Sequence, residues 1–422
     1  MFPPVPTIYL NIKRKTCDPY SVAHYDSQIR LMEVEPYLTW VPENLRAQTI
    51  DPTTLPDRPH VRRRILLLSS TYLTGGAEMF AVNVARILAP YHDVFLWSQR
   101  PGPYVITGDL PVHEGDPVEL AKSLDVDLVI YNNGAGFWTS DRFRAELPRA
   151  KTVMNLHGLV QWTVNQFKGY EGHIRHVDAF WAFSRVCGAM KYFGFQSPAY
   201  ELHCPVPDER FPFRERRWKA PYNIGYVGRV SVEKNLVNLV LLWHRIWTSL
   251  GDRVRFHFVG GLDPMNKDPE YLAWLGPVVS KAKGLPEWKA MMDAGVLSDY
   301  GQSPPEKVAE VVRRLHVLTL TSDFEGEPVV FTEAMASGCI CSFRDVGEVG
   351  EQLRGHGLLT TARTRKMDTQ ELDEMAASIV DLLHHPKRCQ ERARAGRARY
   401  EQRHAPEAWA ANFNRMIEDV LR

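Results

Sequence analysis

Short apolar runs alternate with helix-length segments along most of the chain, beginning near residue 65. The run ILLLSS at 65–70 is typical of a buried strand, and MFAVNVARILAPY at 79–91 has apolar residues at helical spacing. Further apolar runs, separated by helix-length stretches, are HDVFLWS, DLVIYNN, KTVMNLHG and AFWAFS. Strands that alternate with helices in this way predict a parallel sheet with helices on both faces.

A second series of the same kind begins after a segment that is dense in proline and charge, residues 206–220. Its strand candidates are YNIGYVGRV, VRFHFVGG, HVLTLTS and CICSF, and helices are predicted at LVNLVLLWHRIW, PPEKVAEVVRRL and PVVFTEAMAS. We therefore predict an α/β protein with two doubly wound, Rossmann-like domains, 61–205 and 221–404, joined by a linker at 206–220. Ligands bind such domains at the carboxyl ends of the strands, so we expect the site between the two sheets.

The two ends of the chain lie outside these predicted domains. Residues 1–60 contain many prolines and have no clean period, which predicts an extension lying on a surface. Residues 405–422 form a predicted helix that begins at Ala405 and Pro406. The sequence leaves open whether this last helix packs back on the first domain.

The overall composition excludes several classes of protein. Of the 422 residues, 44% are hydrophobic and 24% are charged, as in ordinary globular proteins. The net charge of +1 gives no strong nucleic-acid signal. No apolar stretch reaches the roughly 18 residues of a transmembrane helix, and the N-terminal segment lacks the residue order of a secretion signal. We expect a cytoplasmic protein, with peripheral contact with a membrane left open.

The patterns that would indicate a metal site or a polyanion site are weak. Cys339 and Cys341 have no second cysteine pair near them, so the six cysteines are predicted to be reduced, and mostly buried, thiols. Asp125 and Asp127 have an Asp-x-Asp spacing that can bind a metal ion, but they precede an apolar strand instead of following one. We predict no metal and no cofactor. The basic run at 392–399 is predicted to be a solvated helix face.

The segment TSDFEGEPVVFTEAMASGCICSF is the most informative part of the sequence. Pro328 suits the first turn of a helix and Gly338 suits its end, so a short helix is predicted at 329–337. This helix is apolar on nearly every side, yet Glu333 lies in its middle. Burying a carboxylate without a hydrogen-bond partner costs several kcal/mol, so we expect Glu333 to face a ligand or a partner. The alternative is an exposed strip beside Thr332.

Two cations follow the first strand of the second series. In GYVGRVSVEKN, Arg229 and Lys234 lie five residues apart in a loop that leads to a helix. Cations at the carboxyl end of a strand can neutralise a diphosphate, including the charge that grows on it as a leaving group. The alternative is ordinary surface charge.

Glu325 and Glu333 are separated by seven residues, with a strand-to-helix turn between them. The segment EGEPVVFTEAMASG resembles the donor-site motif of the retaining glycosyltransferase family 4, which has the GT-B fold. This resemblance implies that Glu333 accepts hydrogen bonds from the ribose of a nucleotide and that Glu325 lies against the transferred sugar. The backbone amides of Val329 and Val330 would bind sugar and phosphate oxygens, as the N-terminus of a helix binds anions.

Other positions match the family outside this motif. The family has a Gly-Arg pair and a lysine at the spacing of Arg229 and Lys234, which implies that these two cations bind the diphosphate. Gly75 and Gly76, in GGAE, match a loop that faces donor phosphate and acceptor, although a glycine pair can also be a simple tight turn.

His157, in NLHGL, matches a histidine that contacts the donor, and Tyr300 is expected near the base. The resemblance covers 61–422, and it departs from the family at Glu348 and Gly350, where the family commonly has glycine and proline.

The resemblance implies an enzyme, specifically a hexosyltransferase that retains the anomeric configuration and needs no metal. It would move a sugar from a nucleotide diphosphate sugar to a hydroxyl of a glycan, a lipid-linked glycan or a small molecule. The expected catalytic residues are Glu325, His157, Arg229 and Lys234. The alternatives are a GT-B phosphorylase or epimerase, and a non-catalytic protein that binds sugar nucleotides.

Overall fold

The computed structural model describes most of the chain from residue 49 onward. The described residues are 49–56, 61–72, 76–102, 106–132, 134–156, 176–183, 195–261, 269–323, 325–362 and 367–422. Most of the predicted extension at 1–60 lies outside these ranges. So do two predicted site residues, Gly75 and His157.

In the described residues, a first sheet has seven parallel strands in the order β3-β2-β1-β4-β5-β6-β7. Strand β1, inside this sheet, is apolar because helices cover both faces, and five of its six residues are buried. The strands are β1 (Arg64–Ser69), β2 (Asp93–Ser98), β3 (Val112–His113), β4 (Leu128–Asn132), β5 (Lys151–Leu156), β6 (Ala179–Ala182) and β7 (Ala199–Glu201). The helices are α3 (Gly76–Leu88), α4 (Pro117–Leu124) and α5 (Ser140–Glu146).

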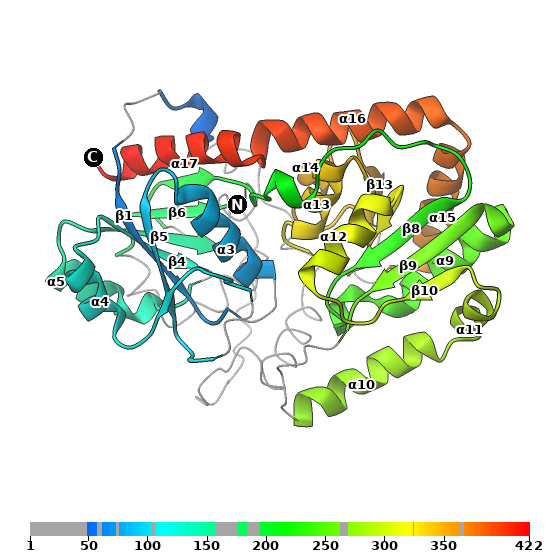
Figure 1. The fold of residues 1–422 in the computed structure, drawn as a ribbon, viewed down its shortest axis with the longest axis horizontal. Coiled ribbons are helices and arrows are strands. Elements are labelled where there is room, and N and C mark those ends of the chain that lie inside the picture. Colours follow the sequence, from blue (N-terminus) through cyan, green and yellow to red (C-terminus); the bar gives the residue numbers. More distant parts are fainter. Residues whose placement is uncertain are drawn as a thin grey trace, which may run out of the picture.

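A second sheet, again counted over the described ranges, has six parallel strands in the order β10-β9-β8-β11-β12-β13. Its strands are β8 (Tyr222–Val227), β9 (Val254–Val259), β10 (Leu297–Asp299), β11 (Val317–Thr319), β12 (Ile340–Arg344) and β13 (Leu358–Thr360). Its helices are α9 (Leu236–Leu250), α10 (Pro269–Lys283), α11 (Pro286–Asp293), α12 (Pro305–Arg314), α13 (Val329–Ser337), α14 (Val349–Gln352) and α15 (Thr369–Leu383). Figure 1 shows the two sheets side by side with their helices, so the predicted α/β fold class is confirmed.

The strand order reverses once in each sheet, and the loops singled out in the sequence follow the strands at these points. In the first sheet the chain turns from β1 toward β2 on one side and toward β4 on the other. In the second sheet the same reversal separates β8 from β11. Loops that leave neighbouring strands in opposite directions open a crevice at the carboxyl edge of a sheet, where ligands bind. Residues 228–235 follow β8 and residues 320–328 follow β11.

Two final helices connect the second domain back to the first. Helix α16 (Pro386–Arg403) lies along the second domain, and α17 (Pro406–Val420) lies over the first (Figure 1). Trp409 and Phe413 of α17 are fully buried in the core of the first domain, where the Trp409 ring lies 5.5 Å from that of Trp181. The first domain is therefore completed by the last helix of the chain.

The basic run on α16 is solvated only in part, because Arg394 is 62% exposed while other arginines of the run are bound to neighbouring segments. Arg397 donates to Asp208 of the linker at 2.6 Å, and its side chain is only 16% exposed. Arg399 lies 3.6 Å from Glu351 and is 18% exposed. The sequence could not show these two contacts, because Asp208 and Glu351 are remote from α16 in the chain.

Four of the six cysteines lie in the described ranges, and these four are free and buried, as predicted. They are Cys204, Cys339, Cys341 and Cys389. None of the helices in the described residues has the length and apolar character needed to cross a bilayer.

Replacing Trp409 with alanine should destabilise the first domain. The indole is fully buried, and its Nε1 donates to the His203 carbonyl at 2.6 Å. We expect Trp409→Ala to lower the free energy of unfolding by about 3–5 kcal/mol, measured by urea denaturation. Trp138→Ala, at a tryptophan that is 43% exposed, is the matched control and should cost much less. Equal losses in the two variants would contradict the packing of α17.

Candidate active site

The loops after β8 and β11 are held together by hydrogen bonds. The backbone N–H of Asp323 donates to the carbonyl of Glu233 at 2.8 Å, and the Asn235 amide donates to the Asp323 carboxylate at 3.1 Å. Thr321 Oγ1 donates to the Asn235 carbonyl at 3.1 Å. These bonds hold the loop after β11 against the loop after β8.

This contact brings Lys234 and Glu325 together. Lys234 Nζ lies 2.5 Å from Glu325 Oε1, and their side chains are 17% and 9% exposed. Ser322 Oγ also donates to Glu325 Oε1, at 2.6 Å. The residue predicted to bind phosphate and the residue predicted to lie against the sugar therefore form one mostly buried ion pair. An entering phosphate group would compete with Glu325 for the lysine.

Arg229 belongs to the same loop but is more exposed. Its Nη2 lies 3.5 Å from Glu233 Oε1, and its side chain is 41% exposed. Glu233 is mostly buried, which alone would raise its pKa, but Arg229, Lys234 and a hydrogen bond from Ser231 outweigh burial and lower it. Glu233 therefore stays ionised between the two cations and holds the loop in place.

Helix α13 begins at the boundary between the domains. Pro328 is its N-cap, and the first helical residue, Val329, packs against the cores of both domains. The first N–H groups of a helix have no partner within the helix, so those of Val329 and Val330 are available to an anion. Gly338 ends the helix with φ 77°, as predicted from the sequence.

Glu333 is half-buried on α13 and lacks a hydrogen-bond partner among the described residues. Burial raises the pKa of its carboxyl to about 7, and the weaker attraction of Arg210 lowers it only in part. The neighbouring Thr332 is fully buried, so the strip proposed as the alternative is not exposed. A carboxylate in such a place is destabilising until a hydrogen-bond donor reaches it.

The contacts of Gly76 and Tyr300 do not involve Lys234 or Glu325. Gly76 begins α3 directly after the loop that follows β1, and a Cβ built there meets no atom within 4 Å. The Tyr300 hydroxyl lies 3.1 Å from His257 Nδ1, and the Tyr300 ring stacks on that imidazole. Tyr300 is thus held against the middle of β9 and does not join Lys234 and Glu325.

The Asp125 and Asp127 pair lies at the opposite edge of the first sheet from Gly76. Asp127 accepts a hydrogen bond from the backbone N–H of Arg64 at 2.8 Å, and Asp125 pairs with the Arg64 side chain at 2.9 Å. Both contacts are at the amino ends of β1 and β4.

The loop that departs from the family pattern packs closely. A Cβ at Gly350 would lie 2.0 Å from Asp345 Oδ1, so a larger residue here would have to displace the Asp345 side chain. Gln352 Nε2 donates to the Pro328 carbonyl at 3.2 Å and so supports the start of α13.

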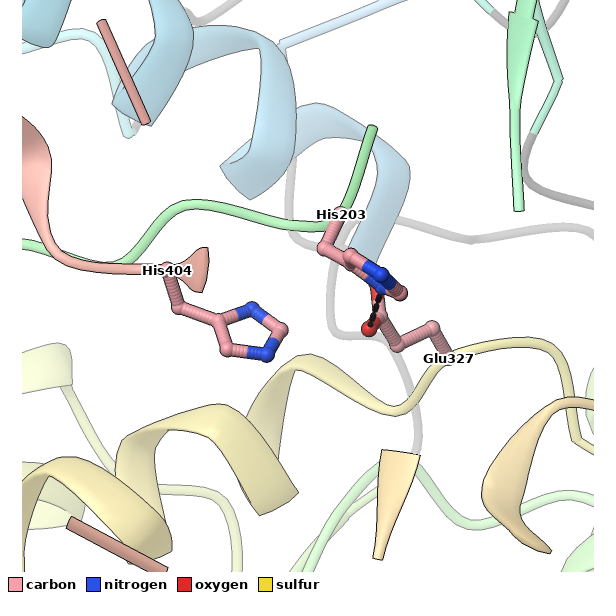
Figure 2. Close-up of side chains that lie close together, drawn as sticks. All are labelled: His203, Glu327 and His404. Atoms are coloured by element: carbon pink, nitrogen blue, oxygen red, sulfur yellow. Dashed lines mark hydrogen bonds and ion pairs between the residues drawn. The ribbon is translucent and has the colours of Figure 1, made fainter. Parts of the chain in front are cut away.

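Sequence reasoning missed Glu327, which stands between Glu325 and Pro328. Glu327, His203 and His404 are buried, and one ligand atom from each lies within 4.8 Å of the others, which makes them the candidate metal ligands of the described residues (Figure 2). No sequence signal could have joined them, because Glu327 is 124 residues from His203.

The comparisons with known proteins agree with this architecture. Residues 208–399 match the family model described as Glycosyl transferases group 1. The fold is similar to sucrose-phosphate synthase from Thermosynechococcus elongatus, at 16% identity and a TM-score of 0.66 over 85% of this chain and 99% of that one. No curated protein matches the sequence of this chain.

Two further solved structures were determined with nucleotides. Anabaena HepE in complex with UDP and glucose is 15% identical, with a TM-score of 0.64 over 85% of this chain and 100% of that one. The pneumococcal O-GlcNAc transferase GtfA in complex with UDP and GlcNAc is 10% identical, with a TM-score of 0.66 over 86% and 100%.

The fold is that of a GT-B protein, with two Rossmann-like domains. The match of residues 208–399 to the glycosyl transferases of group 1 lies almost entirely in the second domain, and together with this fold it supports the predicted glycosyltransferase. The resemblance noted in the sequence is confirmed at this level.

Glu333→Gln should stabilise the protein in the absence of ligand. The folded-state pKa of about 7 exceeds the ordinary value of 4.5, so the wild type loses stability as pH rises from 4.5 to about 7. The variant has no such loss, and above pH 7 we expect it to be more stable by roughly 1–3 kcal/mol in urea denaturation. Glu391→Gln, at an exposed glutamate of α16, is the control and should show no pH-dependent difference. A Glu333→Gln variant that is less stable at every pH would contradict this environment.

Proposed function

We propose that this glycosyltransferase moves a sugar from a nucleotide diphosphate sugar to a hydroxyl acceptor, with retention of configuration and without a metal. The observation that carries the proposal is the mostly buried Lys234–Glu325 pair, which joins the loop after β8 to the loop that leads into the N-terminus of α13. The nucleotide complexes of HepE and GtfA support a donor of this class. The first domain would bind the acceptor, and the second would bind the nucleotide.

In this proposal the leaving diphosphate is stabilised by the chain's own cations. Lys234 and Arg229 would bind the phosphate oxygens, and the free amides at the start of α13 would add hydrogen bonds. Negative charge grows on the diphosphate as the glycosidic bond breaks, so these groups bind the transition state more strongly than the ground state. Their positive charges would take the place of a metal ion at the diphosphate.

The unpaired Glu333 would hold the nucleotide. Two neighbouring ribose hydroxyls can donate to its carboxylate and supply the partners that it lacks among the described residues. Glu325, once Lys234 turns to phosphate, would accept from hydroxyls of the sugar. The acceptor hydroxyl would attack on the face from which the diphosphate leaves, through an oxocarbenium-like transition state, and would pass its proton to a phosphate oxygen.

Two other functions remain testable against this proposal. A GT-B phosphorylase or epimerase would turn over without the added hydroxyl acceptor, and a sugar-nucleotide-binding protein would bind the donor without turnover. A thermal-shift screen of nucleotide sugars, followed by an acceptor panel, separates the three.

Arg229→Ala and Lys234→Ala should each lower kcat about 100-fold or more at saturating donor, because each removes a charge that acts on the departing diphosphate. Lys234→Ala should also cost about 1–3 kcal/mol of stability, since Glu325 loses its buried partner. Lys289→Ala, at an exposed lysine of α11, is the matched control. Near-normal kcat in folded Arg229→Ala or Lys234→Ala would remove the phosphate role.

Chelation should leave the activity unchanged. The charge on the diphosphate is met by Arg229 and Lys234, and the Asp125 and Asp127 pair lies at the opposite edge of the first sheet from Gly76. Turnover with and without EDTA measures this, with a metal-dependent glycosyltransferase assayed in parallel. Activity that is lost in EDTA and restored by Mn²⁺ would overturn the metal-independent mechanism.

A further inference from the structure

Arg344 carries a buried charge beside the loops of the candidate site. It is the last residue of β12, and its side chain is fully buried. Strand β12 pairs with β11, where Thr319 lies opposite Ser342. Arg344 therefore lies level with the first residues of the loop that follows β11. A guanidinium stays charged in proteins, so its burial requires acidic partners.

Two carboxylates from different elements supply these partners. Arg344 Nη2 lies 2.9 Å from Glu371 Oε2, and Glu371 is also fully buried. Arg344 Nη1 lies 3.6 Å from Oδ1 of Asp323, whose side chain is 15% exposed. Glu371 is in the first turn of α15, where its backbone N–H donates to the N-cap residue Asp368 at 2.8 Å. The guanidinium thus joins a helix of the second domain to the loop after β11.

Asp323 lies where the two loops of the site meet. Its Oδ1 accepts from Asn235 Nδ2 at 3.1 Å and from the backbone N–H of Met367 at 3.4 Å, while its own N–H donates to the Glu233 carbonyl at 2.8 Å. Asn235 directly follows Lys234, and its φ of 48° is a left-handed conformation that asparagine tolerates better than most residues do. The position of the Asp323 carboxylate therefore fixes the point from which Lys234 extends.

The same carboxylate stands two residues before Glu325. Lys234 and Glu325 form their ion pair across the two loops, so the pair depends on how these loops are joined at Asp323. Without Arg344, Asp323 and Glu371 would be two like charges in a mostly buried region. Their repulsion, and the cost of burying an unpaired charge, would draw Asp323 toward water and open the junction of the loops.

We propose that Arg344 is a positioning residue for the phosphate-binding lysine. Anchored to α15 through Glu371, it holds Asp323 in place, and Asp323 holds the loop that carries Lys234. This inference rests on the proposed function, because it assumes that Lys234 acts on the leaving diphosphate. Arg344 itself contacts neither phosphate nor sugar in this assignment, since both of its terminal nitrogens face carboxylates.

Arg344→Met tests this role through kinetics, because it keeps a long side chain and removes the charge. We expect kcat at saturating donor to fall about tenfold, with the donor KM changed less than about threefold, since Lys234 acts mainly on the transition state. Arg245→Met is the matched control, because Arg245 pairs with Asp373 of the same helix α15 at 2.5 Å but at a partly exposed surface. It should leave kcat unchanged. A normal kcat in folded Arg344→Met would overturn the proposal.

A second substitution separates positioning from stability. Arg344→Met leaves Glu371 as a buried carboxylate without its cation, so the variant should be less stable than the wild type. Adding Glu371→Gln removes that charge and should restore much of the stability, which provides a folded protein for the assay. The kcat should stay about tenfold low, because Asp323 is still not held. Recovery of kcat together with stability would show a purely structural role and overturn the proposal.

The effect of Arg344 should also depend on Lys234. In a Lys234→Ala background, Arg344→Met should lower kcat by less than about twofold, because the group that it positions is gone. A further loss of about tenfold in that background would contradict the assignment.

Amide hydrogen exchange tests the contact between Arg344 and Asp323 independently of turnover. The Asp323 N–H is bonded to the Glu233 carbonyl, so Arg344→Met, with or without Glu371→Gln, should speed its exchange about tenfold or more. Arg245→Met should leave this exchange unchanged. If exchange responds in this way but no nucleotide sugar is turned over, the proposed function fails and the hold of Arg344 on Asp323 remains. Turnover with unchanged exchange at Asp323 in Arg344→Met would overturn the inference and leave the proposed function intact.

Discussion

Parallel strand pairing is the constraint on which the rest of this structure depends. Parallel neighbours require a crossover between them, so each strand leaves its sheet at the same edge and returns through a helix. All the loops that carry candidate chemistry are thereby gathered at the carboxyl edges. Where the strand order reverses, beside β1 and beside β8, the departing loops diverge and leave room for a ligand.

A second constraint on the structure is that the chain passes twice between its domains. It leaves the first domain after β7 and returns through α16 and α17. The linker lies along α16, where Asp208 accepts from Arg397, and α17 fills the core beside Trp181. Each domain therefore stabilises a segment that the other supplies. The start of α13 lies at the junction of these crossings, which makes this side of the candidate site dependent on both halves.

The long helices and strands could be predicted from the sequence, and so could the part of the site that lies within one short segment. Apolar runs such as 65–70 and the Pro328 and Gly338 signals predict their strand and helix because the information is local. The edge strands β3, β7, β10 and β13 were missed because two or three residues carry no period. These ion pairs could not be predicted from the sequence either, because Glu325 lies 91 residues from Lys234 and Asp208 lies 189 residues from Arg397.

The completion of the first domain by α17 has a consequence for recombining this protein with its structural relatives. A single cut in the linker would separate β1 to β7 from the helix that fills their core, and would pair a new first domain with a foreign α17. An exchange of first domains that keeps both cores intact needs two cuts, one near residue 205 and one near residue 404. The first domain is thus encoded by two separate stretches of the gene, although it is continuous in space.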